Sequence, residues 1–163
     1  MNIFTQKFSS LFILLVAVAV TFTACDDNGS DSNDDLTVME TIQVNSNLSD
    51  LSSALETTEL DSIITNTAPI TVFAPNNEAL ADDIPQEELK AALEYHVVAQ
   101  NLTFEDLKSL ESVETLAGDS LFFTAENDTV TINGQAIITE NGTEASNGRI
   151  FVIDTVLTTP EAN

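Results

Sequence analysis

The 163-residue sequence contains one cysteine, one histidine and no tryptophan, and these shortages exclude several kinds of structure and chemistry. A lone thiol, Cys25, cannot close an intramolecular disulfide. A zinc site would have one imidazole, that of His96, and would depend on carboxylates for its other ligands. Nucleophilic catalysis is equally disfavoured, because no Gly-x-Ser-x-Gly segment occurs and one histidine would have to serve every role. We therefore expect no catalytic residue and no dedicated metal site.

Basic residues are also scarce. Four lysines and arginines face 27 aspartates and glutamates, which gives a formal net charge of -23. Such a surface repels nucleic acid and anionic lipid headgroups, which excludes both as direct partners. It attracts cations, so weak Ca²⁺ binding by the acidic surface is the one ion interaction that the composition favours. No motif indicates an organic cofactor.

The N-terminus has the pattern of a secretory signal. Lys7 is the only charge in the first 24 residues, and residues 11–20 form an unbroken apolar run. This run is too short for a transmembrane helix, which needs about 20 apolar residues. It leads into residues 22–25, Phe-Thr-Ala-Cys, which resemble a bacterial lipobox. The sequence thus predicts a lipoprotein signal peptide over residues 1–24 and acyl chains on Cys25 that anchor the protein to a membrane. The alternative is a fortuitous thiol near a cleavage site.

The segment after Cys25 is predicted to be a tether. Residues 26–35 contain Asp, Asn, Ser and Gly but no apolar side chain, so we expect a disordered, self-repelling linker. Fully extended, it would hold the following domain about 35 Å from the lipid. Acidic residues directly after a lipidated cysteine also resemble the surface-export tags of some outer-membrane lipoproteins. The expected location is therefore the bacterial cell envelope, in the outer membrane and exposed at the cell surface.

The remaining segment, residues 36–160, is long enough for one domain with one core. Its front half has helical periodicity. Leu48, Leu51 and Leu55 recur at helical spacing, with Asn47 before them as a cap, and a second short helix follows.

A longer helix is expected from Pro85, which suits a first helical position. Thr103 can cap a further short helix. The apolar face of the longer helix would carry Leu89, Ala92, Leu93 and His96.

From Val113 onward the period changes from helix to strand. Runs rich in Val, Ile, Phe and Thr are separated by Gly-Asp, Asn-Asp and Asn-Gly turns, which indicates a compact antiparallel meander. Helices first and strands later predict an α+β domain. Strands are expected at residues 121–125, 130–132, 136–139 and 150–157.

Residues 70–80 have the pattern of a buried strand that runs into a helix. The β-branched and aromatic residues favour a strand, and Pro75, which lacks an N–H, ends its hydrogen-bond ladder. Asn76 can then cap a helix whose first turn carries Glu78, an acid at the positive end of the helix dipole. The strand residues of this strand–helix motif are Thr71, Val72, Phe73 and Ala74.

Residues 147–157 form a second motif, in which Asn147 and Gly148 would supply a turn with positive φ before a nearly continuous apolar strand. Together with residues 70–80 and the pair Tyr95-His96, this arrangement resembles the fasciclin domain over roughly residues 48–160. The resemblance implies N-terminal helices packed on a C-terminal antiparallel β-wedge or sandwich. Fasciclin domains are mostly extracellular adhesion and interaction modules, so it also implies a surface-displayed binding protein.

Four residues are candidates for an interaction or structural motif: Tyr95, His96, Ile153 and Asp154. In the fasciclin family the Tyr-His pair is regarded as structural, and in some members it is proposed for adhesion. His96 falls on the apolar face of its predicted helix, which favours a structural ring with hydrogen-bonded nitrogens. An Asp at the position of Asp154 is linked with adhesion motifs in the family. Its local alternative is an acid that accepts backbone N–H bonds at a strand kink.

The predicted function is adhesion, or interaction with extracellular matrix or polysaccharide, by a non-catalytic domain anchored to the cell envelope. The expected partner is a polysaccharide or a protein of the cell surface or matrix, with divalent cations as bridges. Two alternatives remain open. One is an envelope hydrolase that uses a pair of carboxylates about 5 to 9.5 Å apart. The other is a passive structural component of a surface assembly.

Overall fold

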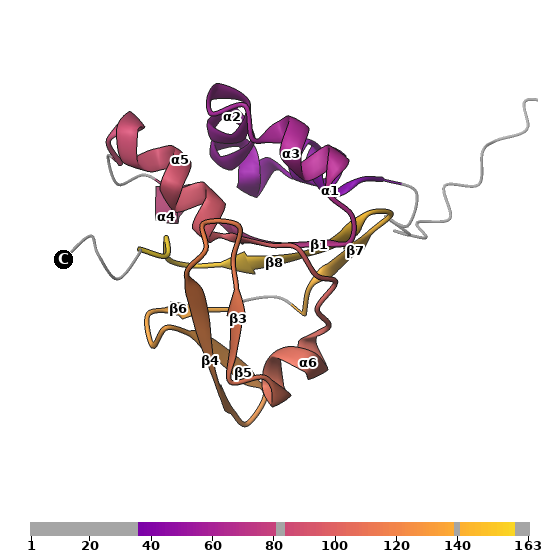
Figure 1. Ribbon diagram of the computed structural model, residues 1–163, viewed down its shortest axis with the longest axis vertical. Helices are drawn as coiled ribbons and strands as arrows, with labels where there is room; N and C mark the ends of the chain where they lie inside the picture. Colours follow the sequence, from indigo (N-terminus) through magenta and orange to yellow (C-terminus); the bar gives the residue numbers. More distant parts are fainter. Residues whose placement is uncertain (1–35, 81–83, 139–140, 159–163) are drawn as a thin grey trace, which may run out of the picture. The chain divides into compact units, whose positions relative to one another are not determined.

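The computed structural model describes residues 36–80, 84–138 and 141–158. All of them belong to one compact unit, Ser32–Asn163 (Figure 1). Helices dominate its first half and strands its second half, so the predicted α+β class is confirmed. The predictions for the signal peptide, Cys25 and the tether concern residues 1–35, which lie outside the described residues.

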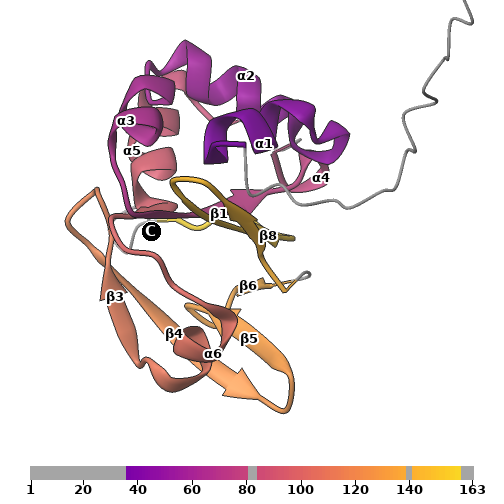
Figure 2. The same cartoon turned by 90° about the vertical axis from the view of Figure 1, so that its right-hand side faces the viewer.

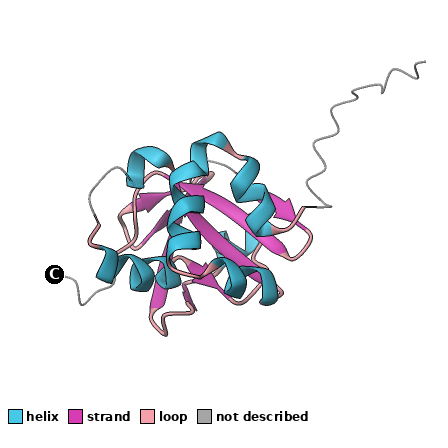
Figure 3. Cartoon of the chain, turned by 90° about the horizontal axis from the view of Figure 1, so that it is seen from above, coloured by secondary structure: helices cyan, strands magenta, loops and turns pink. Residues whose placement is uncertain are grey.

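Five of the helices in the described part of the chain lie on one face of a sheet (Figures 1 and 3). The predicted leucine stripe is confirmed, because Leu48, Leu51 and Leu55 are all buried in the core beneath these helices. A further helix, α6 (Phe104–Ser109), lies on the other side of that sheet (Figure 1). The five are α1 (Val38–Val44), α2 (Ser49–Thr57), α3 (Asp61–Asn66), α4 (Asn77–Leu80) and α5 (Gln86–Tyr95), with a 3₁₀ turn at Ser46–Leu48 before α2.

The helix starts differ from the expected ones at two places. Asn47 does not cap α2; instead Asn45 caps the preceding 3₁₀ turn, its Oδ1 accepting the Asn47 N–H at 3.0 Å. Pro85 occupies the N-cap position of α5 and not its first helical position. Helix α1 is an addition to the expected elements. Its start carries a capping box between Thr37 and Glu40, a signal that is present in the sequence.

The first sheet has the strand order β2-β1-β8-β7, with β1 (Ile70–Pro75) and β8 (Gly148–Ile153) at its centre. These two strands are parallel, in unbroken register from their first residues to their last. The edge strands β2 (Val97–Val98) and β7 (Thr143–Ala145) are antiparallel to their neighbours. Every residue of β1 is buried, because helices cover one face of this sheet and the second sheet covers the other.

The second sheet is the predicted antiparallel meander, in the order β3-β4-β5-β6. Buried and exposed residues alternate along most of it, so that Phe123 is buried whereas Phe122 is exposed, and the alternation ends at the exposed last three residues of β4. Asn127 and Asn133 have positive φ at the turns after β4 and β5, as expected for hairpin turn residues. The strands are β3 (Ser112–Glu114), β4 (Ser120–Glu126), β5 (Thr129–Ile132) and β6 (Ala136–Ile137).

The last predicted strand, residues 150–157, is wrong in its place, its end and its start. Strand β8 leaves the meander to pair with β1, and it ends at Ile153. It does not follow a positive-φ turn either, since neither Asn147 nor Gly148 has a positive φ. Gly148 is needed for space: an ideal Cβ at this position would lie 1.9 Å from the carbonyl oxygen of Ile70. The glycine therefore permits the close approach of the two central strands.

Two hydrophobic clusters hold the layers together. One lies between the helices and the first sheet, and the other lies between the two sheets. In the second cluster the Phe73 ring stacks on Phe151 with centroids 5.9 Å apart, and it meets Phe123 at 5.8 Å. The aromatic rings thus fill the space where the sheets face each other.

The two sheets are joined at both of their corners. At one corner the Leu116 N–H, just after β3, donates to the carbonyl of Val97 on β2 at 2.8 Å. At the other corner Ile138, just after β6, forms a β-bridge with Ile153 at the end of β8. Figure 2 shows the resulting β-wedge, with α1 to α5 on one side of it. The predicted arrangement of helices on a β-wedge is therefore confirmed, although β1 and β8 form a parallel pair within it.

Candidate functional site

Tyr95 is the last residue of α5 and is fully buried, so it cannot itself contact a ligand. Its hydroxyl donates to the Ser120 carbonyl at 3.1 Å and accepts from Asn133 Nδ2 at 2.9 Å. Asn133 Oδ1 in turn accepts the Phe122 N–H at 2.9 Å. Tyr95 therefore supports, from within the core, the strand backbone between the Ser120 carbonyl and the Phe122 N–H.

His96 follows Tyr95 and is also buried. Its Nδ1 lies 2.6 Å from the Ala92 carbonyl oxygen, and its Nε2 accepts the Leu157 N–H at 2.9 Å. Because the Leu157 bond requires an unprotonated Nε2, the ring is neutral with its proton on Nδ1. Burial lowers the pKa of His96 to about 4, and the Ala92 hydrogen bond opposes that shift. Both nitrogens are engaged, so the ring links α5 to the segment after β8 and has no nitrogen free for catalysis.

Asp154 lies directly after β8 and is exposed. Its Oδ1 accepts the Ile137 N–H of β6 at 2.9 Å and the Thr155 hydroxyl at 3.3 Å. The backbone N–H contact is the local role that the sequence offered as the alternative to adhesion. Its neighbour Ile153 is buried between the sheets. Asp154 therefore fixes the corner where the end of the first sheet meets β6.

The strand–helix motif belongs to the core. All residues of β1 are buried, and the Thr71 hydroxyl donates to a backbone carbonyl and accepts a backbone N–H in the loop after β2, at 2.6 and 2.9 Å. Pro75 is the last paired residue of the strand, and Asn76 Oδ1 accepts the Ala79 N–H at 2.8 Å, which caps α4 as predicted. Glu78, in the first turn of α4, is exposed. The motif positions the central strand and offers no exposed cluster of side chains.

Tyr95 and Asp154 both support one surface, which we call the outer face: the side chains of β3, β4, β5 and β6 that point away from the core. Phe122 is 59% exposed on this face and Ile137 is 42% exposed. In the cross-strand register Phe122 lies opposite Ser112. The outer face comprises Ser112, Glu114, Ser120, Phe122, Thr124, Glu126, Thr129, Thr131 and Ile137.

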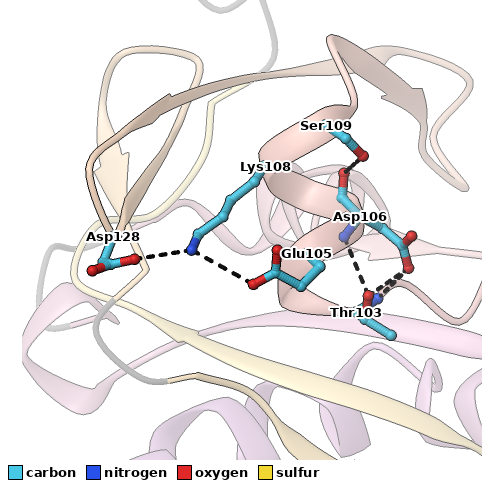
Figure 4. Close-up of polar contacts among 6 residues, drawn as sticks. All are labelled: Thr103, Glu105, Asp106, Lys108, Ser109 and Asp128. Atoms are coloured by element: carbon cyan, nitrogen blue, oxygen red, sulfur yellow. Dashed lines mark hydrogen bonds and ion pairs between the residues drawn. The ribbon is translucent and has the colours of Figure 1, made fainter.

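A separate polar cluster joins α6 to the turn between β4 and β5, as Figure 4 shows. Lys108 Nζ lies 3.1 Å from Asp128 and 3.6 Å from Glu105, and it is 4.8 Å from the centroid of the Phe104 ring. The hydrogen bond to Asp128 raises the pKa of Lys108, so its ammonium group remains charged. The cluster ties a surface helix to a hairpin, and its acids are occupied by a cation of the chain itself.

Two helix caps hold carboxylates in the ionised form. The Thr103 hydroxyl and N–H donate to Asp106 at 2.7 and 2.9 Å, which lowers the pKa of Asp106 and confirms the predicted cap of α6 (Figure 4). The Thr37 N–H and hydroxyl donate to Glu40, each at 2.8 Å, and lower the pKa of Glu40 in the same way. A carboxylic acid that donates a proton in catalysis needs a raised pKa. These two carboxylates are therefore poor general acids.

The residues that the structure describes contain neither a metal-binding cluster nor a membrane-spanning helix. Among them, no group of three or more His, Cys, Asp and Glu side chains is placed to hold a metal ion. Over the same three ranges, no helix combines the length and apolarity needed to cross a bilayer. Arg149 on β8 pairs with Glu144 on β7 at 3.2 Å, so another acid near the first sheet is neutralised within the chain.

The sequence patterns do not identify the residues at the centre of the outer face. Phe122 and Phe123 are adjacent in a predicted strand, and neighbouring residues of a strand point to opposite faces. One of the two rings therefore had to point away from the core, but a shift of one residue in register would exchange them. The sequence predicts a turn at Asn133. It does not predict the side-chain hydrogen bond between Asn133 and Tyr95, because the two residues are far apart in the chain.

Comparison with known proteins identifies the domain. Residues 46–160 match the model of the fasciclin domain. Protein sll1483 of Synechocystis is 33% identical over 137 residues, a match that covers 77% of this chain and 74% of that protein. The rabbit transforming growth factor-beta-induced protein ig-h3 is 30% identical over 133 residues. This second match covers 76% of the present chain but only 19% of the rabbit protein.

The fold also matches a solved structure, that of a FAS1 domain pair from the insect cell adhesion molecule Fasciclin I. The TM-score is 0.65 at 22% sequence identity, and the match covers 77% of this chain and 52% of the other. At this identity the likeness concerns the fold alone. Mouse Stabilin-2 is 36% identical over 96 residues, which are 55% of this chain and 4% of that protein.

Proposed function

Because the chain belongs to the fasciclin domain family, we propose that it is a non-catalytic module for adhesion or for interaction with extracellular matrix or polysaccharide. Fasciclin I, a neighbour in fold, is an insect cell adhesion molecule. The observation that carries the proposal is the outer face, an exposed sheet surface with a large aromatic side chain and rigid support from Tyr95 and Asp154. Rigid support lowers the entropic cost of binding, since few side chains must be ordered when a partner docks.

The proposal includes anchoring to the bacterial cell envelope. The apolar run after Lys7 and the lipobox-like segment before Cys25 support export and lipid attachment, and the acidic tether supports display at the outer surface. A tritiated fatty acid fed to the native host would label the full-length protein, and the change Cys25→Ser would abolish the label and release the protein from membranes. Labelling that persists in Cys25→Ser would contradict the anchor.

Charge limits the partner. A chain with a net charge of -23 repels other polyanions, so the partner is a neutral polysaccharide, a protein with cationic segments, or an acidic polymer bridged by divalent cations. Nucleic acid is excluded on the same ground. Membrane contact is through the lipid anchor alone.

The decisive experiment is a binding assay with a soluble form, residues 32–163, which contains both hydrophobic clusters. We expect saturable binding to whole cells or to envelope polysaccharides, measured with and without calcium and at low and high salt. Binding that depends on calcium would identify an acidic partner bridged by cations. Binding that is independent of calcium and of salt would identify a neutral partner.

A matched pair of variants locates the binding face. Ile137→Ser removes an apolar side chain from the outer face and leaves intact the backbone N–H that Asp154 accepts. Val44→Ser removes one that is 70% exposed on α1 in the helical layer. We expect the first change to weaken binding and the second to have no effect. Absence of saturable binding under every condition would refute adhesion as the domain's own activity, and co-purification with a fixed partner would then favour a passive role in an assembly.

The absence of catalysis is part of the same proposal. Both nitrogens of His96 are hydrogen-bonded within the core, and the pKa values of Glu40 and Asp106 are lowered by their caps. These observations leave the carboxylate-pair hydrolase without a candidate general acid at these sites. Release of reducing sugar from any polysaccharide that the domain binds would contradict this part of the proposal.

A further inference from the structure

The outer face has a feature that adhesion in general does not require, an aromatic ring displayed on a strand surface beside serine and threonine side chains. Phe122 is 59% exposed, whereas the adjacent Phe123 is 8% exposed and packs on Phe73. The aromatic pairs of the described residues involve rings inside the wedge, and Phe122 takes part in none of them. Its ring is therefore available to a partner.

The surroundings of Phe122 are rich in hydroxyl groups. Ser112 lies opposite Phe122 on β3, and Thr124 lies two residues further along β4 on the same face. Thr131 on β5 is the cross-strand partner of Thr124, and Ile137 on β6 is the cross-strand partner of Thr131. Each hydroxyl can both donate and accept a hydrogen bond. These side chains combine an apolar ring with neutral groups that bond in both directions.

Charge on this surface lies at its ends and at the β6 edge. Glu114 and Glu126 lie at the ends of β3 and β4, outside the two rows of paired side chains that contain Phe122 and Thr124. The exposed carboxylate of Asp154 lies beside the backbone of Ile137, at the β6 edge. A cationic protein would find no acid to pair with at the centre. A second copy of this chain would bring another formal charge of -23 to the contact, as would any polyanion of similar charge density.

We propose that the outer face is a binding platform for a neutral polysaccharide, with a sugar ring stacked on Phe122 and its hydroxyls bonded to Ser112, Thr124 and Thr131. The C–H face of a pyranose ring is apolar and its rim carries hydroxyl groups. The apolar face matches the Phe122 ring, and the rim hydroxyls match the serine and threonine hydroxyls around it. Strands are about 4.8 Å apart, so the surface from β3 to β6 is about 14 Å wide and accommodates a short stretch of a polysaccharide chain. This inference rests on the proposed adhesion function and specifies the class of ligand.

The platform is held rigid from beneath. Asn133 bonds the Phe122 N–H, and the Tyr95 hydroxyl bonds both Asn133 and the backbone of Ser120. These contacts fix the strand segment that carries the ring, so little conformational entropy is lost when a sugar stacks on it. Tyr95 is in this sense a positioning residue for the ligand, although it is fully buried.

The test uses residues 32–163 and an array that contains neutral glucans and mannans beside acidic polysaccharides such as alginate and pectate. We expect saturable binding to at least one neutral polymer, unchanged by 1 M salt and by a calcium chelator. Phe122→Ala should weaken this binding at least tenfold, and Phe122→Trp should keep or strengthen it. Val44→Ala, which also removes an exposed apolar side chain, is the matched control and should bind like the unmodified chain.

The outcomes separate this inference from the function that it deepens. Binding of cells that is equal in Phe122→Ala and in the unmodified chain would overturn the platform while leaving adhesion in place. Binding restricted to acidic polysaccharides and abolished by the chelator would also overturn it, in favour of cation bridges. Self-association of the chain that depends on Phe122 would overturn it in favour of a second copy as occupant. Absence of binding to any cell or polymer would remove both proposals.

Discussion

The stability of the domain should depend on pH through the buried side chain of His96. The ring is neutral in the folded state, because its Nε2 must accept the Leu157 N–H while Nδ1 donates to Ala92. Protonation of Nε2 would remove the acceptor and place a charge in the core. Burial accordingly lowers the pKa of His96 in the folded chain to about 4, against 6.5 for an exposed histidine.

The difference between the two pKa values sets the magnitude. Between pH 6.5 and 4 the unfolded chain binds a proton that the folded chain rejects, so the contribution of His96 to stability is complete above pH 6.5 and is lost as the pH falls toward 4. The full loss for 2.5 pKa units is about 3 kcal/mol, and about 2 kcal/mol of it is lost by pH 5. The carboxylates are the same in the unmodified domain and in a variant without His96, so the difference between the two proteins isolates the contribution of His96.

Two measurements check this prediction. The chain contains a single histidine, so an NMR titration of the imidazole resonances reports His96 without assignment. Urea unfolding of residues 32–163 at pH 7.5 and pH 5, beside the variant His96→Gln, gives the change in free energy of unfolding. We expect the unmodified domain to lose about 2 kcal/mol more than His96→Gln over this interval. An imidazole that titrates near pH 6.5 in the folded domain, or equal losses in the two proteins, would refute the reasoning.

Three further changes test the contacts that define the wedge and its surface, each by urea unfolding. Gly148→Ala places a Cβ 1.9 Å from the Ile70 carbonyl oxygen and should lower the free energy of unfolding by about 3 kcal/mol or more. The control Gly134→Ala, at a residue with φ of 67° and open space around it, should lower it by about 1 kcal/mol. Equal losses would contradict the close approach of the two strands at Gly148. Tyr95→Phe removes the hydrogen-bond partner of the Ser120 carbonyl and of Asn133 Nδ2, two partly buried contacts, and should cost about 1–3 kcal/mol. A neutral effect would show that water replaces the hydroxyl. Asp154→Ala removes one exposed backbone contact and should cost about 1 kcal/mol, so a loss beyond about 3 kcal/mol would assign it a larger role.

Local signals in the sequence were sufficient for several elements. The stop at Pro75, the cap at Asn76 and the cap at Thr103 each depend on residues within a few positions of one another, and all three are confirmed. The resemblance to the fasciclin domain, which combined two separated motifs, is confirmed by the family match over residues 46–160. The lipid anchor at Cys25 stays a prediction.

The errors arose where the structure depends on residues far apart in the chain. The parallel pairing of β8 with β1 was missed, because an apolar run indicates burial but not the partner strand. For the same reason Gly148 was assigned to a turn, although its role is set by the carbonyl of Ile70 across the sheet. The outer face was missed because Phe122 and Phe123 are equivalent in the sequence until the register against the core is known.

The central position of β8 has a consequence for how the chain folds during its synthesis. Strand β1 lies near the start of the domain and β8 near its end, yet they are adjacent at the middle of the first sheet. A chain still emerging from the ribosome or from a membrane channel lacks the strand that covers one side of β1, so its core stays open until almost the last residue has appeared. The domain should therefore remain unfolded, and so export-competent, throughout synthesis. Products truncated before residue 148 should be degraded by proteases. In the export that we propose, folding would then begin from a chain that already contains β8.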